Sequence, residues 1–173
     1  MKEKILVSGC LIGLNCKYNG KNNYIEKINE FLKDYDVIPI CPEIMGGLPI
    51  PRKPAEIKDG KVVTIDGMDV TDNYIKGANE VLFLAKKYNI KKALLKSKSP
   101  SCGYNNIYDG TFTNRLINKN GITTELLINN GIEIVNIEEN WLSPLNMVVY
   151  TTCFRGFFCD KKDKYRYRSR IDW

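Results

Sequence analysis

Three of the six cysteines lie at the ends of short apolar runs that are typical of buried strands. Cys10 follows the run 3–8, Cys41 ends the run 36–41, and Cys102 lies a few residues beyond the run 91–96. If these strands are parallel neighbours, the three sulfur atoms lie along the carboxyl edge of one sheet, where open α/β sheets bind their ligands. Thiolates bind both zinc and iron–sulfur clusters. The pattern therefore predicts a metal or cluster centre.

The spacing of the thiols favours a cluster over zinc. No Cys-x2-Cys pair of the kind that is common in structural zinc sites occurs in the chain. Three dispersed thiolates suit a [4Fe–4S] cluster whose fourth iron stays open for another ligand. Cys16 is either a fourth ligand or only a neighbour. The alternative for all three cysteines is that they are small buried hydrophobic side chains.

Polar residues next to these cysteines are candidates for proton transfer and substrate binding. Glu43 lies two residues beyond Cys41 and is placed to move a proton, or else it caps a helix or forms an ion pair. Ser99 and Ser101 precede Cys102, and their hydroxyl groups either bind a substrate oxygen and relay a proton or stabilise a turn.

The proline-rich segment 42–55 adds two more candidates. Gly46 permits a close backbone approach, either to a ligand or to another part of the chain. Arg52 is expected to clamp an anion or a carbonyl group, with a surface ion pair as the alternative.

Composition excludes several kinds of enzyme. The 173 residues contain no histidine, which rules out Ser-His-Asp and Cys-His mechanisms for this chain. No segment is apolar over the length of a membrane span and no signal-peptide pattern opens the chain, so we expect a cytoplasmic protein without a membrane partner. Cysteines in that compartment serve thiolate chemistry more often than disulfides.

The pattern of apolar residues and turn signals predicts an α/β fold. We expect strands at 3–8, 36–41, 91–96 and 132–137, an Asp-Gly hairpin near 56–65, and irregular loops at 9–23, 42–55 and 97–114. Helices are expected over three further ranges, 23–33, 72–88 and 123–130. This order predicts a three-layer sandwich with a mostly parallel four-stranded sheet, Rossmann-like or flavodoxin-like, plus the small β-hairpin.

The C-terminal part of the chain does not fit this scheme. Residues 150–173 hold seven Lys or Arg and three Asp, whereas the rest of the chain is nearly neutral despite the overall charge of +6. We therefore expect a domain over 1–142 and a basic, aromatic extension over 143–173 of unknown role, which contains Cys153 and Cys159. This extension is either a solvated terminus or a nucleic-acid contact.

Several longer motifs in the chain resemble the thiouracil desulfidase family. They are Ser8 to Gly13 with Cys16 and Tyr18, Cys41 to Glu43, Gly46 to Pro49, Pro51-Arg52, Pro54 to Glu56, Asp69 to Thr71, Gly77-Ala78, Ser99 to Gly103, and Tyr108 to Phe112. The resemblance spans roughly residues 3–140 and does not reach the extension.

The resemblance implies a cytoplasmic enzyme that removes sulfur from thiolated pyrimidines without net redox chemistry. It implies a [4Fe–4S] cluster held by Cys10, Cys41 and Cys102, with Glu43 as the acid–base group and Ser99 as a helper. Two other readings stay open. In one the substrate is a thiolated tRNA base recruited by the extension, and in the other the centre is a non-catalytic cluster or metal module. The oligomeric state is left open.

Overall fold

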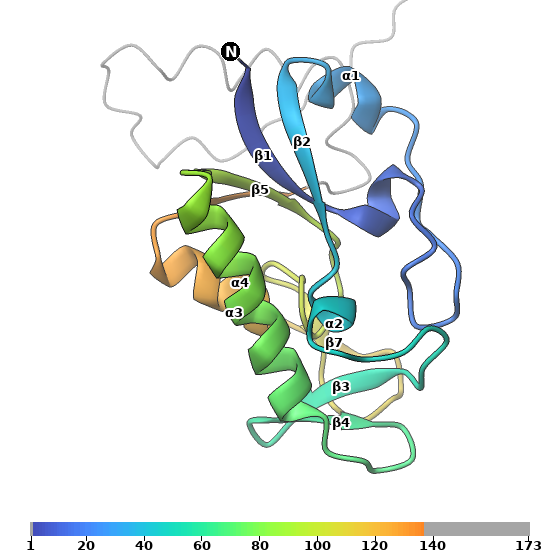
Figure 1. Cartoon of the computed structure of the whole chain (residues 1–173). Coiled ribbons are helices and arrows are strands. Elements are labelled where there is room, and N and C mark those ends of the chain that lie inside the picture. Colours follow the sequence, from blue (N-terminus) through green and yellow to red (C-terminus); the bar gives the residue numbers. More distant parts are fainter. Residues whose placement is uncertain (1, 137–173) are drawn as a thin grey trace, which may run out of the picture. The chain divides into compact units, whose positions relative to one another are not determined.

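The computed structural model describes residues 2–136, whose centre is a four-stranded parallel sheet. Its strands are β1 (Glu3–Ser8), β2 (Tyr35–Ile40), β5 (Lys92–Leu95) and β8 (Glu133–Asn136). They lie in the order β2-β1-β5-β8 (Figure 1), and every neighbouring pair is parallel. The predicted sheet is confirmed.

The strand order places a ligand site between β1 and β5. Counted along the chain, the four strands lie in the order second, first, third, fourth, which is the flavodoxin-like order. The chain leaves β1 toward β2 on one side and later continues through β5 and β8 on the other. In sheets of this kind the crevice outside the carboxyl ends of the two central strands binds the ligand.

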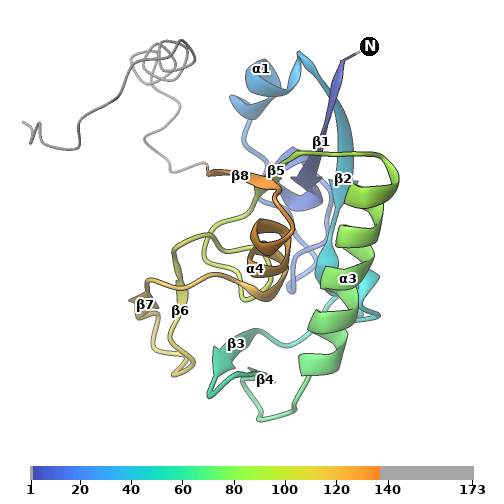
Figure 2. The same cartoon turned by 90° about the vertical axis from the view of Figure 1, so that its left-hand side faces the viewer.

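Helices cover both faces of the sheet, which confirms the predicted three-layer sandwich. Leu6 packs on one face with residues of α3 (Thr71–Lys87) and α4 (Ile122–Asn129). Ile5 and Val7, its neighbours in β1, point to the other face and pack with α1 (Ile28–Leu32). Successive strand side chains alternate between faces, so one strand contributes to two cores. The turned view shows α1 and α3 on opposite sides of β1 and β2 (Figure 2).

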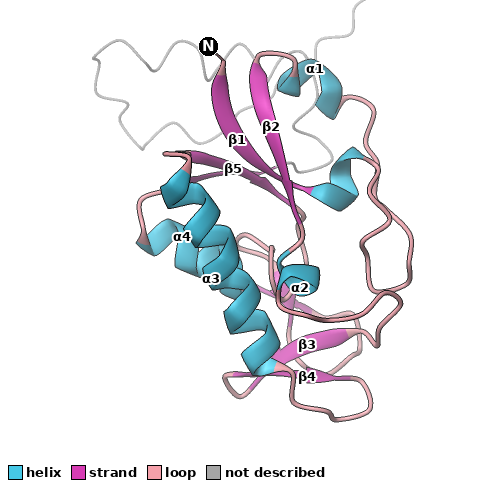
Figure 3. Cartoon of the chain, viewed as in Figure 1, coloured by secondary structure: helices cyan, strands magenta, loops and turns pink. Residues whose placement is uncertain are grey.

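The predicted hairpin is also present. It consists of β3 (Ala55–Lys58) and β4 (Lys61–Thr64), which pair antiparallel next to the N-terminal end of α3 (Figure 3). Asp59 and Gly60 both have positive φ, 49° and 80°, as a tight two-residue hairpin turn requires. A second short pair, β6 (Ile107–Tyr108) with β7 (Leu116–Ile117), begins inside the segment 97–114 that was predicted to be irregular.

The helix predicted over 23–33 is shorter, and a 3₁₀ turn precedes it. Gly9–Ile12 forms this turn, η1, directly after β1. The backbone N–H groups of Asn23 and Ile25 donate to the carbonyl groups of Cys10 and Leu11, at 2.8 and 3.2 Å. Residues tied to another segment in this way cannot form the hydrogen bonds of a helix, so α1 begins at Ile28.

The segment 42–55 contains a short helix where an irregular loop was predicted. This is α2 (Pro42–Met45), with Pro42 at its first turn and Gly46 as its C-cap. Proline is tolerated there because the first N–H groups of a helix have no intrahelical partner. The N–H groups of Met45 and Gly46 donate to the carbonyl groups of Cys41 and Pro42, at 3.0 and 2.8 Å.

Two glycines let α2 and α3 approach each other closely. A Cβ atom on Gly77 would lie 1.9 Å from the carbonyl oxygen of Pro42, and one on Gly46 would lie 2.0 Å from that of Asn73. The Asn73 side-chain amide donates to the Gly46 carbonyl at 2.9 Å. Since α2 begins directly after Cys41, this contact fixes the end of β2 against the long helix.

Replacing Gly77 with alanine is therefore expected to destabilise the fold by about 1–3 kcal/mol. Glycine to alanine at an open helical site stabilises by about 1 kcal/mol, so the sign itself reports the close contact. Urea denaturation followed by circular dichroism measures the change. Lys76→Ala, at an exposed position of the same helix, is the matched control. A Gly77→Ala variant as stable as the native chain contradicts the contact.

The contacts divide the chain into Met1–Glu138 and Glu139–Trp173. The second unit lies outside the described residues, and so does the extension predicted over 143–173 with Cys153 and Cys159. The predicted boundary at residue 142 stays a prediction. Within the described range, no helix combines the length and the apolar character that a membrane span needs.

Candidate functional site

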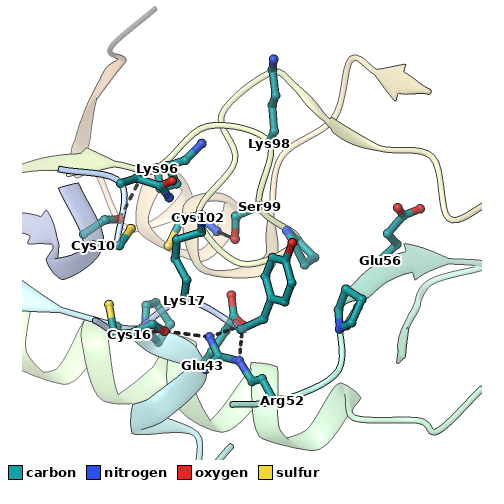
Figure 4. A pocket seen from close by; sticks show the side chains of 18 of the residues that line it. Cys10, Cys16, Lys17, Glu43, Arg52, Glu56, Lys96, Lys98, Ser99 and Cys102 are labelled. Atoms are coloured by element: carbon teal, nitrogen blue, oxygen red, sulfur yellow. Dashed lines mark hydrogen bonds and ion pairs between the residues drawn. The ribbon is translucent and has the colours of Figure 1, made fainter. Parts of the chain in front are cut away.

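A cavity of about 470 Å³ opens at the carboxyl ends of β1, β2 and β5. The three cysteines predicted to converge, Cys10, Cys41 and Cys102, all line it, and so does Cys16. Figure 4 shows Cys10 and Cys102 on one side of this space, with Glu43 and Arg52 across from them. The parallel sheet therefore brings together thiols that are up to 92 positions apart in the sequence.

The turns after β1 and β5 hold two of these cysteines by their backbones. Cys10 lies in η1, and its carbonyl group accepts the N–H of Asn23 at 2.8 Å. Before Cys102, the Ser99 hydroxyl oxygen accepts the backbone N–H groups of both Ser101 and Cys102, each at 3.1 Å. The chain thus fixes each thiol before any ligand arrives.

Cys41 lies at the junction between β2 and α2. Its backbone is extended, with φ −138° and ψ 98°, and its carbonyl group accepts the first hydrogen bond of α2. The thiol faces the loop after η1, since Sγ lies 3.7 Å from the carbonyl oxygen of Cys16 and donates to it. The end of the strand and the start of the helix therefore aim this side chain into the cavity.

The four thiols differ in how readily they lose a proton. Burial raises the pKa of Cys102 to about 12. A hydrogen bond with the thiol of Cys16, together with burial, raises the pKa of Cys41. A hydrogen bond from Cys16 lowers the pKa of Cys10, whereas the pKa of Cys16 itself is raised. Because metal ligation needs thiolates, a group that binds here must displace protons from Cys41 and Cys102.

The donor set fits an iron–sulfur core better than a single ion. Within residues 2–136, no three Cys, Asp or Glu side chains stand close enough together to hold one metal ion. Three separated thiols around a shared cavity suit a core that has several metal atoms at its corners. Cys10, Cys41 and Cys102 are therefore the thiols of this cavity that could hold such a core.

Glu43 and Arg52 form an ion pair in the opposite wall. The Arg52 Nε and Nη2 atoms lie 2.8 and 2.7 Å from Glu43 Oε2, and the side chains are only 7% and 16% exposed. Arg52 also donates to the carbonyl groups of Pro49 and Cys16, at 3.2 and 3.0 Å. The guanidinium group thus holds the carboxylate and the Cys16 loop together. The sequence did not indicate whether Arg52 would bind substrate or pair with an acid, and the structure shows the pair.

Two further wall residues were not predicted. Tyr74, on α3, is buried, and burial together with the Glu43 carboxylate raises the pKa of its phenol. Lys96, just after β5, also lines the cavity. Tyr74 follows the helical periodicity of an ordinary core residue, so no sequence signal separates it from the core. In the sequence, Lys96 is the polar residue that ends the predicted strand 91–96, and this position does not indicate a role at the site.

The other predicted substrate contacts fall into two groups. Ser99 lines the cavity, and its oxygen accepts two hydrogen bonds, which leaves its own O–H free to donate. Ser101 is fully buried behind Cys102, where its hydroxyl bonds that of Thr123 at 2.8 Å. Gly46 packs against Asn73 of α3, as described above. Neither Ser101 nor Gly46 is among the residues that line the cavity, and their role as substrate contacts stays a prediction.

Glu56 connects the hairpin to the aromatic side of the cavity. Its Oε2 atom accepts the backbone N–H groups of Gly110 and Phe112, both at 3.0 Å, although the carboxylate is more than 50 positions away in the sequence. Phe112 has a φ of 59° and lines the cavity together with Tyr108. The carboxylate therefore sets the position of an aromatic ring at the site.

Glu56→Ala is expected to release this loop. It leaves two N–H groups without their acceptor, which costs about 1–3 kcal/mol for each group that stays buried. We expect a higher KM for an aromatic substrate with a smaller effect on kcat, since the reacting groups keep their places. Glu56→Gln retains a side-chain oxygen acceptor and is the matched control. Equal KM values for Glu56→Ala and the native chain contradict this role.

Comparisons with known proteins show the family to which the chain belongs. The family model for 2-thiouracil desulfurase matches residues 5–139. The chain belongs to the 2-thiouracil desulfurase family. The matched range ends close to the last described strand and includes every residue that lines the cavity. The family resemblance inferred from the sequence motifs is confirmed.

Two relatives extend the comparison. A solved structure titled as the [4Fe-4S]-dependent thiouracil desulfidase TudS is 38% identical in sequence, with a TM-score of 0.76, and the match covers 87% of this chain and all of that one. An uncharacterised protein of Bacillus subtilis (strain 168), YbbK, is 41% identical over an alignment of 145 residues, and the match covers 78% of this chain and 96% of YbbK. The 2-thiouracil desulfurase family thus accounts for the whole fold described here.

Proposed function

We propose that this chain is a cytoplasmic [4Fe–4S]-dependent desulfidase that acts on a thiolated pyrimidine, as the free base or the nucleoside. In this reaction water replaces sulfur at the thiocarbonyl carbon, so that the oxo pyrimidine and hydrogen sulfide form without net oxidation or reduction. The observation that carries the proposal is the convergence of three thiols from three strand ends on one cavity that also holds a fixed carboxylate. Family membership and the likeness to TudS support it.

Cys10, Cys41 and Cys102 are the residues that would hold the cluster. When bound, a cluster with three protein ligands supplies a Lewis-acidic iron for the substrate sulfur. Cys16 lines the same cavity but is not assigned as a ligand, because the family resemblance implies only Cys10, Cys41 and Cys102 as ligands.

Glu43 is the proposed acid–base group. Its carboxylate is held by two contacts from Arg52, both to Oε2, and the phenol of Tyr74 approaches the same carboxylate. A carboxylate fixed in this way takes a proton from the attacking water without having to be oriented first. It can then return that proton to the departing sulfur.

Ser99 is the proposed hydrogen-bond donor to the substrate. Both of its recorded hydrogen bonds use its oxygen as acceptor, so the proton is available for an oxygen or nitrogen on the pyrimidine ring. Phe112 and Tyr108 give the cavity an aromatic wall on which a flat ring can stack. Together these groups would orient the ring so that its thiocarbonyl carbon faces the water near Glu43.

An anaerobic assay tests the proposal. The full chain is reconstituted with iron and sulfide and given 2-thiouracil, 4-thiouracil and their nucleosides in turn. We expect loss of the thiocarbonyl absorbance of at least one compound, with one sulfide released per molecule converted. Protein without iron is the control and should show no turnover. A fully loaded protein that leaves all four compounds unchanged contradicts the proposed function.

A further inference from the structure

Lys96 places a positive charge in the wall of the cavity. The residue follows β5 directly, and its backbone N–H donates to the Ser8 hydroxyl oxygen at the end of β1, at 3.0 Å. The side chain is half-buried and lines the cavity. Its ammonium group donates to the carbonyl oxygen of Ser97 at 2.9 Å and lies 3.4 Å from the Ser97 hydroxyl. Among residues 2–136, no acidic side chain forms an ion pair with it.

Three other cationic residues line the cavity, Lys17, Arg52 and Lys98, and Arg52 is in a different situation from Lys96. Arg52 is paired with Glu43 at 2.7 Å. Around Lys96, the groups that favour its positive charge are the thiols of Cys10 and Cys102, whereas Lys17 and Lys98 oppose it. Burial lowers the pKa of Lys96, as expected for a cation removed from water without a partner. A partly buried, unpaired charge is unfavourable unless an anion occupies the adjacent space.

The proposed cluster is such an anion. Three thiolates outweigh the positive charge of the oxidised cubane core, so the loaded site carries a net negative charge. The sulfide product, which is an anion, would add to it. Figure 4 shows Lys96 beside Cys10 and Cys102, whereas the side chain of Lys98, which also lines the cavity, points away from these thiols. Nearby charge and hydrogen bonding to the sulfurs are among the factors that set the potential of such clusters.

We propose that Lys96 is the positioning residue that balances the negative charge of the cluster on the Cys10 and Cys102 side. This inference rests on the proposed function, because it needs the cluster to be present. Lys96 acts through the charge of its ammonium group and touches no reacting atom. It stabilises the loaded site, retains the iron, and favours the addition of further negative charge, which includes the sulfide left by the substrate.

The midpoint potential of the cluster measures this charge directly, although the reaction itself transfers no electrons. The full chain is reconstituted anaerobically and titrated with dithionite, and the reduced cluster is followed by electron paramagnetic resonance. Lys96→Met should shift the balance about tenfold against the reduced form, which equals about 59 mV toward more negative potential for a one-electron couple. Lys96→Arg should stay close to the native value. Lys98→Met, which removes an exposed charge from the same loop, is the matched control and should change little.

Iron retention provides a second readout. If Lys96→Met keeps the fold by circular dichroism but does not hold iron, while Lys96→Arg does, the need for a charge is supported even without a potential. Equal potentials and equal iron contents in Lys96→Met and the native chain overturn the inference while the proposed function stands. An Arg variant that behaves like the Met variant also overturns it, since charge is then not the cause. A native chain that takes up no cluster overturns both proposals.

Discussion

Glu43→Gln is expected to lower kcat for desulfuration by about 10²–10⁴-fold, the usual contribution of a general acid–base group. The amide keeps the shape of the side chain and an oxygen that accepts from Arg52, but it cannot take a proton from water. Because Glu43 is not a proposed cluster ligand, the iron content should stay at the native value. Steady-state kinetics at matched iron content separates these effects.

Glutamine is the informative substitution at this position, and alanine is not. Arg52 is only 7% exposed, so removal of the carboxylate leaves a buried guanidinium group without its partner. Breaking a buried pair in this way typically costs about 3–5 kcal/mol, and the loss of fold would hide any catalytic effect. Glu26→Gln makes the same substitution at an exposed glutamate outside the cavity and is the matched control. If the Glu43→Gln variant has the native kcat at full iron content, Glu43 is not the acid–base group.

Serine substitution of Cys10, Cys41 or Cys102 is expected to reduce bound iron and acid-labile sulfide to less than about a tenth of the native content. A hydroxyl is a much weaker ligand for iron than a thiolate, and a cluster with three protein ligands has none to spare. Turnover should disappear together with the iron. Metal analysis, the visible absorbance of the cluster and the thiouracil assay on the same samples test this.

Cys16→Ser is the matched control, because it removes a thiol from the same cavity. Cys16 is 7% exposed and contacts both Cys10 and Cys41, so it matches the proposed ligands in burial and location. The cluster should need Cys16 only if this thiol is itself a ligand. We expect this variant to keep most of its iron. Cys102 packs in an apolar cluster, and Cys102→Ala therefore accompanies the serine variant to separate ligand loss from the cost of a buried hydroxyl. Iron loss in Cys16→Ser as deep as in the other three would mean four protein ligands and no open iron.

The strands and the hairpin turn could be predicted from patterns of residues that are close together in the sequence. The apolar runs that end near Cys10, Cys41 and Cys102 predicted three parallel strands with their thiols at one edge, and Asp59-Gly60 predicted the hairpin turn. Strand formation and tight turns depend on residues that are close in the sequence, so a single chain is enough to read them. The resemblance to the family motifs then indicated that the thiols at this edge of the sheet serve a desulfuration reaction.

Contacts between side chains of distant segments became known only from the folded structure. The segment 42–55 looked irregular from its prolines, yet Pro42 opens α2, and the glycines at 46 and 77 allow α2 to pack on α3. Glu56 looked like an ordinary strand residue, but it accepts two N–H groups from a loop more than 50 positions away. Such contacts depend on how distant segments pack, and no local period records them.

The same reason separates the candidates for the site. Ser99 and Ser101 are equivalent in the sequence, two positions apart in one turn, but only Ser99 lines the cavity because Ser101 is buried against Thr123 of α4. The sequence left open whether Arg52 clamps an anion or forms an ion pair, and the structure adds the pair with Glu43 at a residue that also lines the cavity. Residue type and spacing indicated the chemistry that the chain can perform. The packing of the three layers decided which of those residues face the cavity.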